Sequence, residues 1–323
     1  MCRVLAYLGE PVLLEEILHK PSVSFVNQTH QAAVHHRLNL AGSGLLAWDA
    51  RSDTPLVPYA HRTTQLAIYD RNLLALARKV KATCLLAHLR GVAYDTSANI
   101  SEANLHPFQF DGARLALAHN GQLARFEETK WALARHIAPT LREAIRGSTD
   151  SEWLYALVLS QLDDPLADLS TADMAKALGR AFSVLAKVRR ELGIRTFSPM
   201  NVFLSDGNDI LAACYTFDLR SREGLPDDYH VPDESVLRIW YSLGHSYGLH
   251  DGEWRLLQEG GAPTSCLIAS EPLTRDHASW CEVPLQHFVY VRRTGGAPRV
   301  EVAPIVLEEL EELEVLEELE EHG

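Results

Sequence analysis

The chain opens with Met1-Cys2-Arg3-Val4-Leu5-Ala6-Tyr7-Leu8-Gly9, the stretch around which the rest is organised. The run from Val4 is typical of a strand, with Cys2 just before it. If an aminopeptidase removes Met1, Cys2 carries both a thiol and a free α-amine. That amine has a reference pKa of about 7.7–8.0 and can accept the thiol proton near neutral pH. The alternative is a small buried cysteine without chemistry.

The composition predicts a globular protein with a sizeable core. The chain has 323 residues, of which 46% are hydrophobic and 23% are charged. Its net charge of −13 argues against a nucleic-acid partner, which would require a basic face. Residues 305–323 contain nine Glu and no Lys or Arg, so the rest of the chain carries only −4.

Cysteine usage and hydropathy predict a cytoplasmic protein without a membrane segment. The five cysteines are odd in number, widely spaced and form no C-x-x-C pair, which is typical of reduced thiols. The sequence shows neither an apolar run of about 18 residues nor a signal-peptide core. It also lacks an H-E-x-x-H motif and a phosphate loop. We therefore expect neither a metal nor a cofactor.

Strand-like runs stand at both ends of the chain, with helical patterns between them. This order favours an α+β layered fold over a doubly wound sheet. Helices are predicted after Pro11 over 12–18, over 70–81 and 171–192, and from the T-x-x-E capping pattern of Thr149 and Glu152. A long loop is predicted over 91–107. The predicted strands are 45–48, 83–90, 115–119, 201–204, 210–217, 236–243, 264–270 and 287–293.

Four places along the chain could carry chemistry, and each has a structural alternative. Arg90 ends a predicted strand and could bind an anion or merely pair with a surface acid. Asn120-Gly121 could donate to an oxyanion or form a plain type I′ turn. Asp150, at a predicted helix start, could hold an ammonium group or simply favour the helix dipole. His106, before Pro107, could fix a loop or act in proton transfer.

Five short motifs contain these candidate residues and Cys2. They are Met1-Cys2-Arg3, Ala87-His88-Leu89-Arg90, Asn104-Leu105-His106-Pro107-Phe108, His119-Asn120-Gly121 and Gly147-Ser148-Thr149-Asp150-Ser151-Glu152. In order and approximate spacing they resemble the class II glutamine amidotransferases, which are N-terminal nucleophile hydrolases. Further matches at 9–16 and 269–274 are similar to the stand-alone branch, which includes the ergothioneine-biosynthesis amidohydrolase and a glutathione-degradation relative. The resemblance covers roughly residues 2–293.

The resemblance implies a four-layer αββα sandwich of two mainly antiparallel sheets. It also implies a role for each site residue. Cys2 would attack the γ-carbonyl of a glutamine-like side chain, and Asn120 and Gly121 would form the oxyanion hole. Arg90 would bind the substrate α-carboxylate and Asp150 the α-ammonium group. His106 would support the geometry of the substrate-binding loop.

Two segments depart from the family pattern. Residues 40–48 lack the acid and aromatic that the stand-alone branch usually has before a Trp, which leaves the substrate open. Residues 305–323 repeat Leu every three positions among Glu. We expect a glutaminase-like domain over 2–304 and an acidic helical tail over 305–323. The tail is either solvated or pairs with a second copy or a protein partner.

The leading hypothesis is a cytoplasmic hydrolase of γ-glutamyl amides, acting on glutamine or a γ-glutamyl-linked small molecule. No synthase domain follows residue 293, so water is the expected acceptor. One alternative is a glutaminase subunit that passes ammonia to a separate synthase partner. Another is a catalytically silent member of the fold that binds or assembles through its tail.

Overall fold

The first strand, β1, lies in the middle of the larger of two sheets. In this computed structural model the described residues are 2–31, 38–92, 99–219, 221, 238–258, 260–275 and 277–308. Among them the first sheet has the order β10-β9-β11-β1-β4-β2-β3, with β12 paired to β9. Its strands are β1 (Arg3–Leu13), β2 (Ser43–Trp48), β3 (Tyr59–Thr63), β4 (Lys81–Leu89), β9 (Trp240–His250), β10 (Glu253–Leu257), β11 (Ser265–Ala269) and β12 (Cys281–Glu282).

The second sheet has the order β14-β13-β7-β6-β5, with β8 paired to β6. All pairings that the structure gives in both sheets are antiparallel. Strand β5 lies at one edge of this sheet, so one side of its backbone has no neighbouring strand along most of its length. The strands are β5 (Ala116–Gly121), β6 (Ser198–Ser205), β7 (Ile210–Cys214), β8 (Thr216–Phe217), β13 (His287–Thr294) and β14 (Ala297–Pro304).

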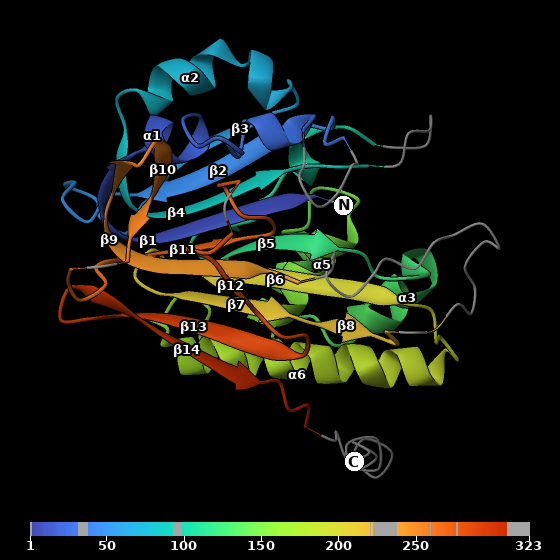
Figure 1. Ribbon diagram of the computed structural model, residues 1–323. Coiled ribbons are helices and arrows are strands. Elements are labelled where there is room, and N and C mark those ends of the chain that lie inside the picture. Colours follow the sequence, from blue (N-terminus) through green and yellow to red (C-terminus); the bar gives the residue numbers. More distant parts are fainter. Residues whose placement is uncertain are drawn as a thin grey trace, which may run out of the picture.

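Helices cover the outer faces of both sheets (Figure 1). Helices α1 and α2 lie over the first sheet, whereas α3, α5 and α6 lie under the second. The predicted four-layer αββα sandwich is therefore confirmed. The helices are α1 (Leu14–Leu18), α2 (Arg71–Ala77), α3 (Phe126–Ala134), α4 (Pro139–Glu143), α5 (Asp150–Leu159) and α6 (Thr171–Glu191), with 3₁₀ turns at Asn27–Thr29, Ala67–Tyr69 and Glu102–Asn104. None of the helices in these described residues is long and apolar enough to cross a membrane.

The alternation of β1 explains why this strand is central. Val4, Ala6 and Leu8 belong to the core between the two sheets. Leu5 and Tyr7, on the opposite face, belong to the core between the first sheet and α1 and α2. A strand buried on both faces reads as a continuous apolar run. A third core, between the second sheet and the helices below it, contains most of α5 and the inner face of α6.

The predicted helix entered through Pro11 is wrong at its start. Strand β1 continues to Leu13, and α1 begins only at Leu14. Pairing with β4 shifts register between Leu8 and Val12. A bulge accommodates a proline, which has no N–H for the ladder. Ladder pairing with Ala82 and Lys81 therefore overrides the helical spacing of 12–18.

Other predicted elements agree in type but not in length. The helix predicted over 70–81 is confined to α2, because β4 already begins at Lys81. The helix predicted over 171–192 is confirmed as α6, whose capping box joins Ser170 and Asp173. Strands β3, β10, β12 and β14 were not predicted. The tail prediction lies mostly outside the described residues, and Pro304 ends β14.

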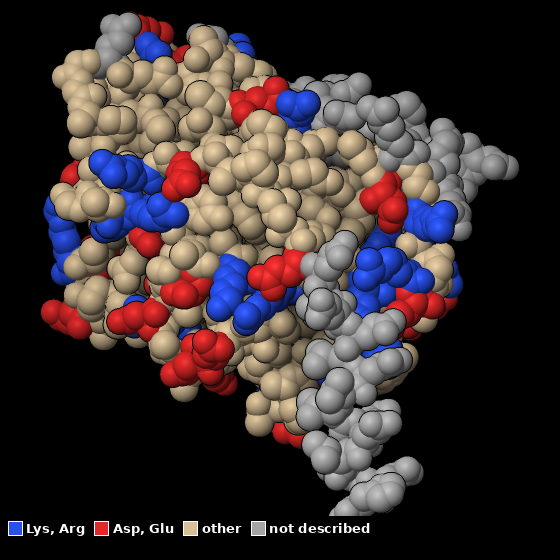
Figure 2. Space-filling model, turned by 90° about the horizontal axis from the view of Figure 1, so that it is seen from below, with Lys and Arg blue, Asp and Glu red and all other residues tan. Residues whose placement is uncertain are grey.

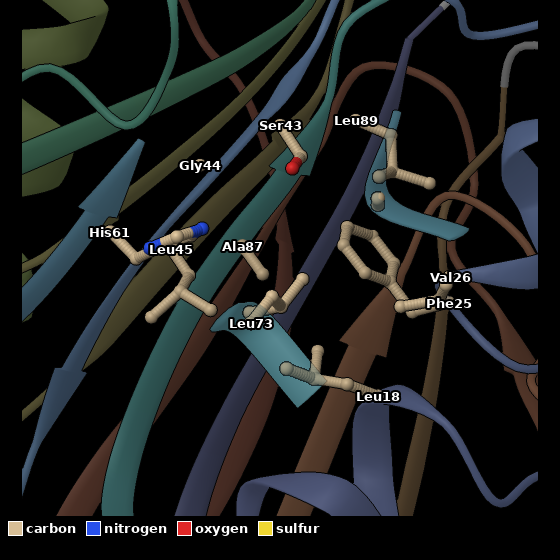
Figure 3. A pocket seen from close by; sticks show the side chains of 11 residues that line it. Leu18, Phe25, Val26, Ser43, Gly44, Leu45, His61, Leu73, Ala87 and Leu89 are labelled. Carbon is tan, nitrogen blue, oxygen red and sulfur yellow. The ribbon is translucent and has the colours of Figure 1, made fainter. Parts of the chain in front are cut away.

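A small apolar cavity lies between the first sheet and the layer of α1 and α2 (Figure 3). Its volume is about 10 Å³, which admits one water molecule at most. The Ser43 hydroxyl points into it, and this oxygen has no hydrogen-bond partner among the described residues. The cavity is thus a packing defect of the core, whereas the site described below lies at the start of β1.

On the face seen from below the helices, basic and acidic side chains lie beside one another (Figure 2). Blue and red groups alternate around wide uncharged areas, and the described part of this face shows no continuous basic surface. Exposed ion pairs among the described residues include Arg292 with Glu301 at 2.9 Å and Arg135 with Glu191 at 3.1 Å.

Candidate active site

Cys2 stands immediately before β1 and is half-buried. Its Sγ accepts a hydrogen bond from the Gly91 backbone N–H at 3.3 Å. The Arg3 guanidinium donates to the Cys2 carbonyl oxygen at 3.0 Å and pairs with Glu271 at 2.7 Å. The side chains of Arg3 and Glu271 are both fully buried. The buried Arg3 side chain therefore fixes the backbone carbonyl of Cys2, while the Cys2 thiol faces Gly91, the residue that follows Arg90.

Arg90 follows the last residue of β4 and lies beside Cys2 because β4 pairs with β1, with Leu89 opposite Arg3. Its Nη1 donates to the Asn99 carbonyl oxygen at 2.8 Å, and the residue is only 8% exposed. Burial lowers the pKa of Arg90, and the nearby Cys2 and Asp150 oppose this shift. The Arg90 cation therefore lies within electrostatic reach of Cys2 and Asp150, which are two of the other predicted site residues.

Asn120 and Gly121 end strand β5 and pair with Asn201 and Met200 of β6, so the alternative of a hairpin turn is wrong. A Cβ on Gly121 would lie 1.9 Å from the Pro199 carbonyl oxygen, so only glycine fits. Asn120 is buried, and its Nδ2 lies 3.3 Å from Ser270 Oγ. Its Oδ1 has no hydrogen-bond partner among the described residues.

The direction of the Gly121 N–H follows from the strand ladder. Gln122 N–H donates to the Pro199 carbonyl oxygen on β6, at 3.0 Å. Leu117 N–H instead donates outward, to Phe108 at 2.9 Å. Successive N–H groups along a strand point to opposite edges. Gly121 has the parity of Leu117, so its N–H points to the outer edge of β5.

Asp150 is the first residue of α5. Its Oδ2 accepts from the Leu123 N–H at 2.6 Å, and its Oδ1 accepts from the Ser151 hydroxyl at 3.1 Å. Only one of the two hydrogen bonds of the predicted capping box is present. Thr149 Oγ1 accepts from the Glu152 N–H at 3.3 Å, but the Glu152 carboxylate accepts from Arg146 and Gly147 instead of Thr149. The carboxylate of Glu152 thus holds the loop before Asp150.

His106 lies in a buried group of three histidines. Its ring is 4.1 Å from that of His88 and 4.6 Å from that of Phe108, and His119 Nδ1 lies 2.9 Å from Ser151 Oγ. Burial lowers the pKa of His88 to about 3, and it lowers the pKa values of His106 and His119 as well. These rings are therefore neutral at physiological pH. The described residues contain no cluster of three or more His, Cys, Asp or Glu that could hold a metal ion.

The structure thus brings Cys2, Arg90, Asn120-Gly121 and Asp150 to one end of the sandwich, whereas His106 lies buried beside them. Sequence reasoning missed the parts of Gly91, Ser270 and Glu271. The family match at 269–274 is the signal in the sequence that points to Ser270 and Glu271. No local pattern indicates contacts that span this much sequence.

Comparisons with known proteins indicate the class to which this chain is similar. A family model described as "Glutamine amidotransferases class-II" matches residues 67–221, which include Arg90, Asn120, Gly121 and Asp150. The chain is 28% identical over 311 residues to the probable glutamine amidotransferase DUG3 of Saccharomyces cerevisiae, covering 91% of this chain and 82% of that protein. It is 26% identical over 200 residues to an uncharacterised protein of Methanocaldococcus jannaschii, covering 61% of this chain and only 47% of that relative.

Two solved structures share the fold. One is a glutamine aminotransferase class-II domain protein from Silicibacter pomeroyi, with a TM-score of 0.58, 23% identity and coverage of 94% of this chain and 100% of that one. The other is the glutamine phosphoribosylpyrophosphate amidotransferase of B. subtilis, with a TM-score of 0.55, 15% identity and coverage of 95% of this chain and 50% of that one.

The chain thus resembles the class II glutamine amidotransferases, so the predicted resemblance is confirmed, and this likeness implies an amide-hydrolysing enzyme. Among curated proteins of this type, the chain is similar over most of its length to the probable glutamine amidotransferase of Saccharomyces cerevisiae.

Proposed function

We propose that the protein hydrolyses a γ-glutamyl amide, either glutamine or a γ-glutamyl-linked small molecule, through a γ-glutamyl thioester on Cys2. The observation that carries this proposal is that Arg90 lies within electrostatic reach of Cys2, while Asn120 is linked through Ser270 to the start of the strand that follows Cys2, at Val4. Cys2, Arg90 and Asn120 come from three separate strands or strand ends, β1, β4 and β5. An isolated Met-Cys start would not need such neighbours.

The first half of the reaction uses the α-amine that Met1 removal exposes. The amine takes the thiol proton, directly or through a water molecule, and Sγ attacks the γ-carbonyl carbon. The carbonyl oxygen becomes an oxyanion that receives hydrogen bonds from the Asn120 amide and the Gly121 N–H. The tetrahedral species then collapses. The C–N bond breaks, the leaving nitrogen takes the proton from the α-amine, and the thioester remains on Cys2.

The second half hydrolyses the thioester. The α-amine accepts a proton from water, and the resulting hydroxide attacks the same carbon. The oxyanion forms again against Asn120 and Gly121, and its collapse breaks the C–S bond. Glutamate leaves and the thiolate recovers its proton. No change of oxidation state occurs, and water is the only co-reactant.

Two groups of opposite charge are proposed to select the substrate. The planar guanidinium of Arg90 matches a carboxylate with two parallel hydrogen bonds, which lysine cannot do. The carboxylate of Asp150 is the proposed partner of the substrate ammonium group. Buried charges interact strongly when they are paired. Together they would favour a free amino-acid head group and leave the γ-amide above Cys2.

An assay of glutamate release tests the proposal. The wild-type protein and a Cys2→Ala variant are incubated with glutamine and a panel of γ-glutamyl compounds, after intact mass has shown that Met1 is absent. We expect release by the wild type alone. A wild-type rate no higher than that of Cys2→Ala on every compound would contradict the proposal and favour a catalytically silent binding protein. Free ammonia that appears only with a second protein would favour a glutaminase subunit.

A further inference from the structure

Ser270 follows β11 and lies between the start of β1 and the end of β5. Its Oγ accepts a hydrogen bond from the Val4 N–H at 3.0 Å, and its own N–H donates to the Val4 carbonyl oxygen at 3.0 Å. The same Oγ is 3.3 Å from the amide of Asn120. Ser270 is 4% exposed. One hydroxyl therefore contacts both the strand that carries the nucleophile and the proposed oxyanion donor.

The hydrogen-bond inventory of this group favours one orientation of the Asn120 amide. A half-turn of the terminal bond exchanges Nδ2 and Oδ1. With Nδ2 toward Ser270, two donors point at one hydroxyl oxygen, and the buried Oδ1 has no partner among the described residues. With Oδ1 toward Ser270, the hydroxyl accepts from Val4 and donates to Oδ1. Both Asn120 N–H groups are then free for a ligand.

We propose that Ser270 is a positioning residue that holds the Asn120 amide with Oδ1 toward the serine hydroxyl and Nδ2 toward the oxyanion. In this orientation the serine hydroxyl accepts from Val4 and gives its own hydrogen to the buried Oδ1, whose lack of a partner would otherwise cost about 1–3 kcal/mol. The Asn120 N–H groups that then have no partner among the described residues are the donors proposed for the oxyanion. A donor fixed before the reaction stabilises the oxyanion without reorganising. The catalytic consequence rests on the proposed function, whereas the Ser270–Asn120 contact does not.

Four proteins form the test: the wild type, Ser270→Ala, Asn120→Ala and the double variant. We expect Ser270→Ala to lower kcat about 10- to 100-fold with KM within about twofold, because the loss concerns the transition state. The double variant should be no slower than Asn120→Ala alone, since Ser270 acts through Asn120. Losses in kcat that multiply in the double variant would overturn the proposal.

Two further variants separate positioning from general support of the fold. Ser270→Thr keeps a hydroxyl and should recover most of the lost kcat. Ser265→Ala, at the start of the strand that Ser270 follows, is the matched control. The Ser265 hydroxyl is also buried and accepts from a β1 backbone N–H, that of Glu10, at 3.2 Å, but it is not bonded to Asn120. An equal fall in kcat for Ser265→Ala and Ser270→Ala would overturn the positioning role.

The unfolding free energies of the four proteins distinguish the two proposals. If the wild type releases no more glutamate than Cys2→Ala, the proposed function fails, but the contact is still tested. Losses of stability that are smaller in the double variant than the two single losses together support the Ser270–Asn120 bond. Fully additive losses would overturn it whatever the activity.

Discussion

The guanidinium of Arg3 and the carboxylate of Glu271 form a fully buried ion pair of 2.7 Å, one residue away from Cys2. Burial lowers the pKa of Arg3, and the charge of Glu271 opposes this shift. The two residues are far apart in the sequence, and the contact joins the start of β1 to the segment that follows β11. The same guanidinium donates to the Cys2 carbonyl oxygen. The pair therefore connects the stability of the fold to the position of the nucleophile.

Removal of one member of this pair should destabilise the protein strongly. Glu271→Gln leaves the Arg3 cation buried without its countercharge, and such losses cost about 3–5 kcal/mol. Urea unfolding followed by fluorescence measures the difference. The double variant Arg3→Met with Glu271→Met should recover part of the loss, because apolar residues of similar size replace both charges. A single variant as stable as the wild type would show that the pair is not needed.

Arg90 and Asn120 should affect different kinetic constants. Arg90→Lys should raise KM about 10-fold or more with a smaller change in kcat, because a bidentate contact to the carboxylate is lost. Asn120→Ala should lower kcat about 10²–10³-fold with little change in KM, because the oxyanion forms only during the reaction. Steady-state kinetics on the best substrate of the panel would reveal the pattern. The reverse assignment of effects would refute these roles.

Gly121 should not tolerate a side chain. A Cβ at this position meets the Pro199 carbonyl oxygen at 1.9 Å and His119 Nε2 at 2.4 Å, so β5 and β6 must separate. We expect Gly121→Ala to cost about 3 kcal/mol and to abolish most activity. Gly179→Ala in α6 is the matched control, because a Cβ there meets nothing within 4 Å. That change should stabilise the helix by about 0.5–1 kcal/mol. Equal effects of the two substitutions in thermal unfolding would contradict the steric argument.

The buried histidines should make the protein acid-sensitive. Burial lowers the pKa of His88 from 6.5 to about 3, and it lowers the pKa of His106 as well. Between the lowered pKa of each histidine and about pH 6.5, the unfolded chain binds more protons than the folded one, so stability falls as the pH falls. Above about pH 6.5 this contribution is fully present.

Urea midpoints measured from pH 7.5 to pH 5 test this expectation. Each buried neutral histidine contributes a loss of about 1.4 kcal/mol per pH unit once the pH is well below 6.5. The variant His88→Gln should show a smaller slope, by about one proton. A wild-type stability that stays constant down to pH 5 would mean that these rings take up protons in the folded state.

Much of the site could be predicted because its residues stand at the ends of locally recognisable elements. The apolar run before Arg90 is a strand, the run before Asn120 is a strand, and Thr149 begins the helix that starts with Asp150. These patterns depend on burial and capping within a few residues, which sequence alone displays. The error at Pro11 has the opposite origin. Pairing of Val12 and Leu13 with β4 decided that segment, and pairing is not a local property.

By itself, the sequence determined the α+β class, the strand that follows Cys2 and the identity of the residues that stand at the ends of β4 and β5. Only the tertiary structure decided how those ends meet. Ser270 and Glu271 reach Asn120 and Arg3 because β11 pairs with β1, so the contacts depend on sheet order and register. Strand order depends on which apolar faces can be buried together. That outcome belongs to the whole chain, and no single segment of the sequence contains it.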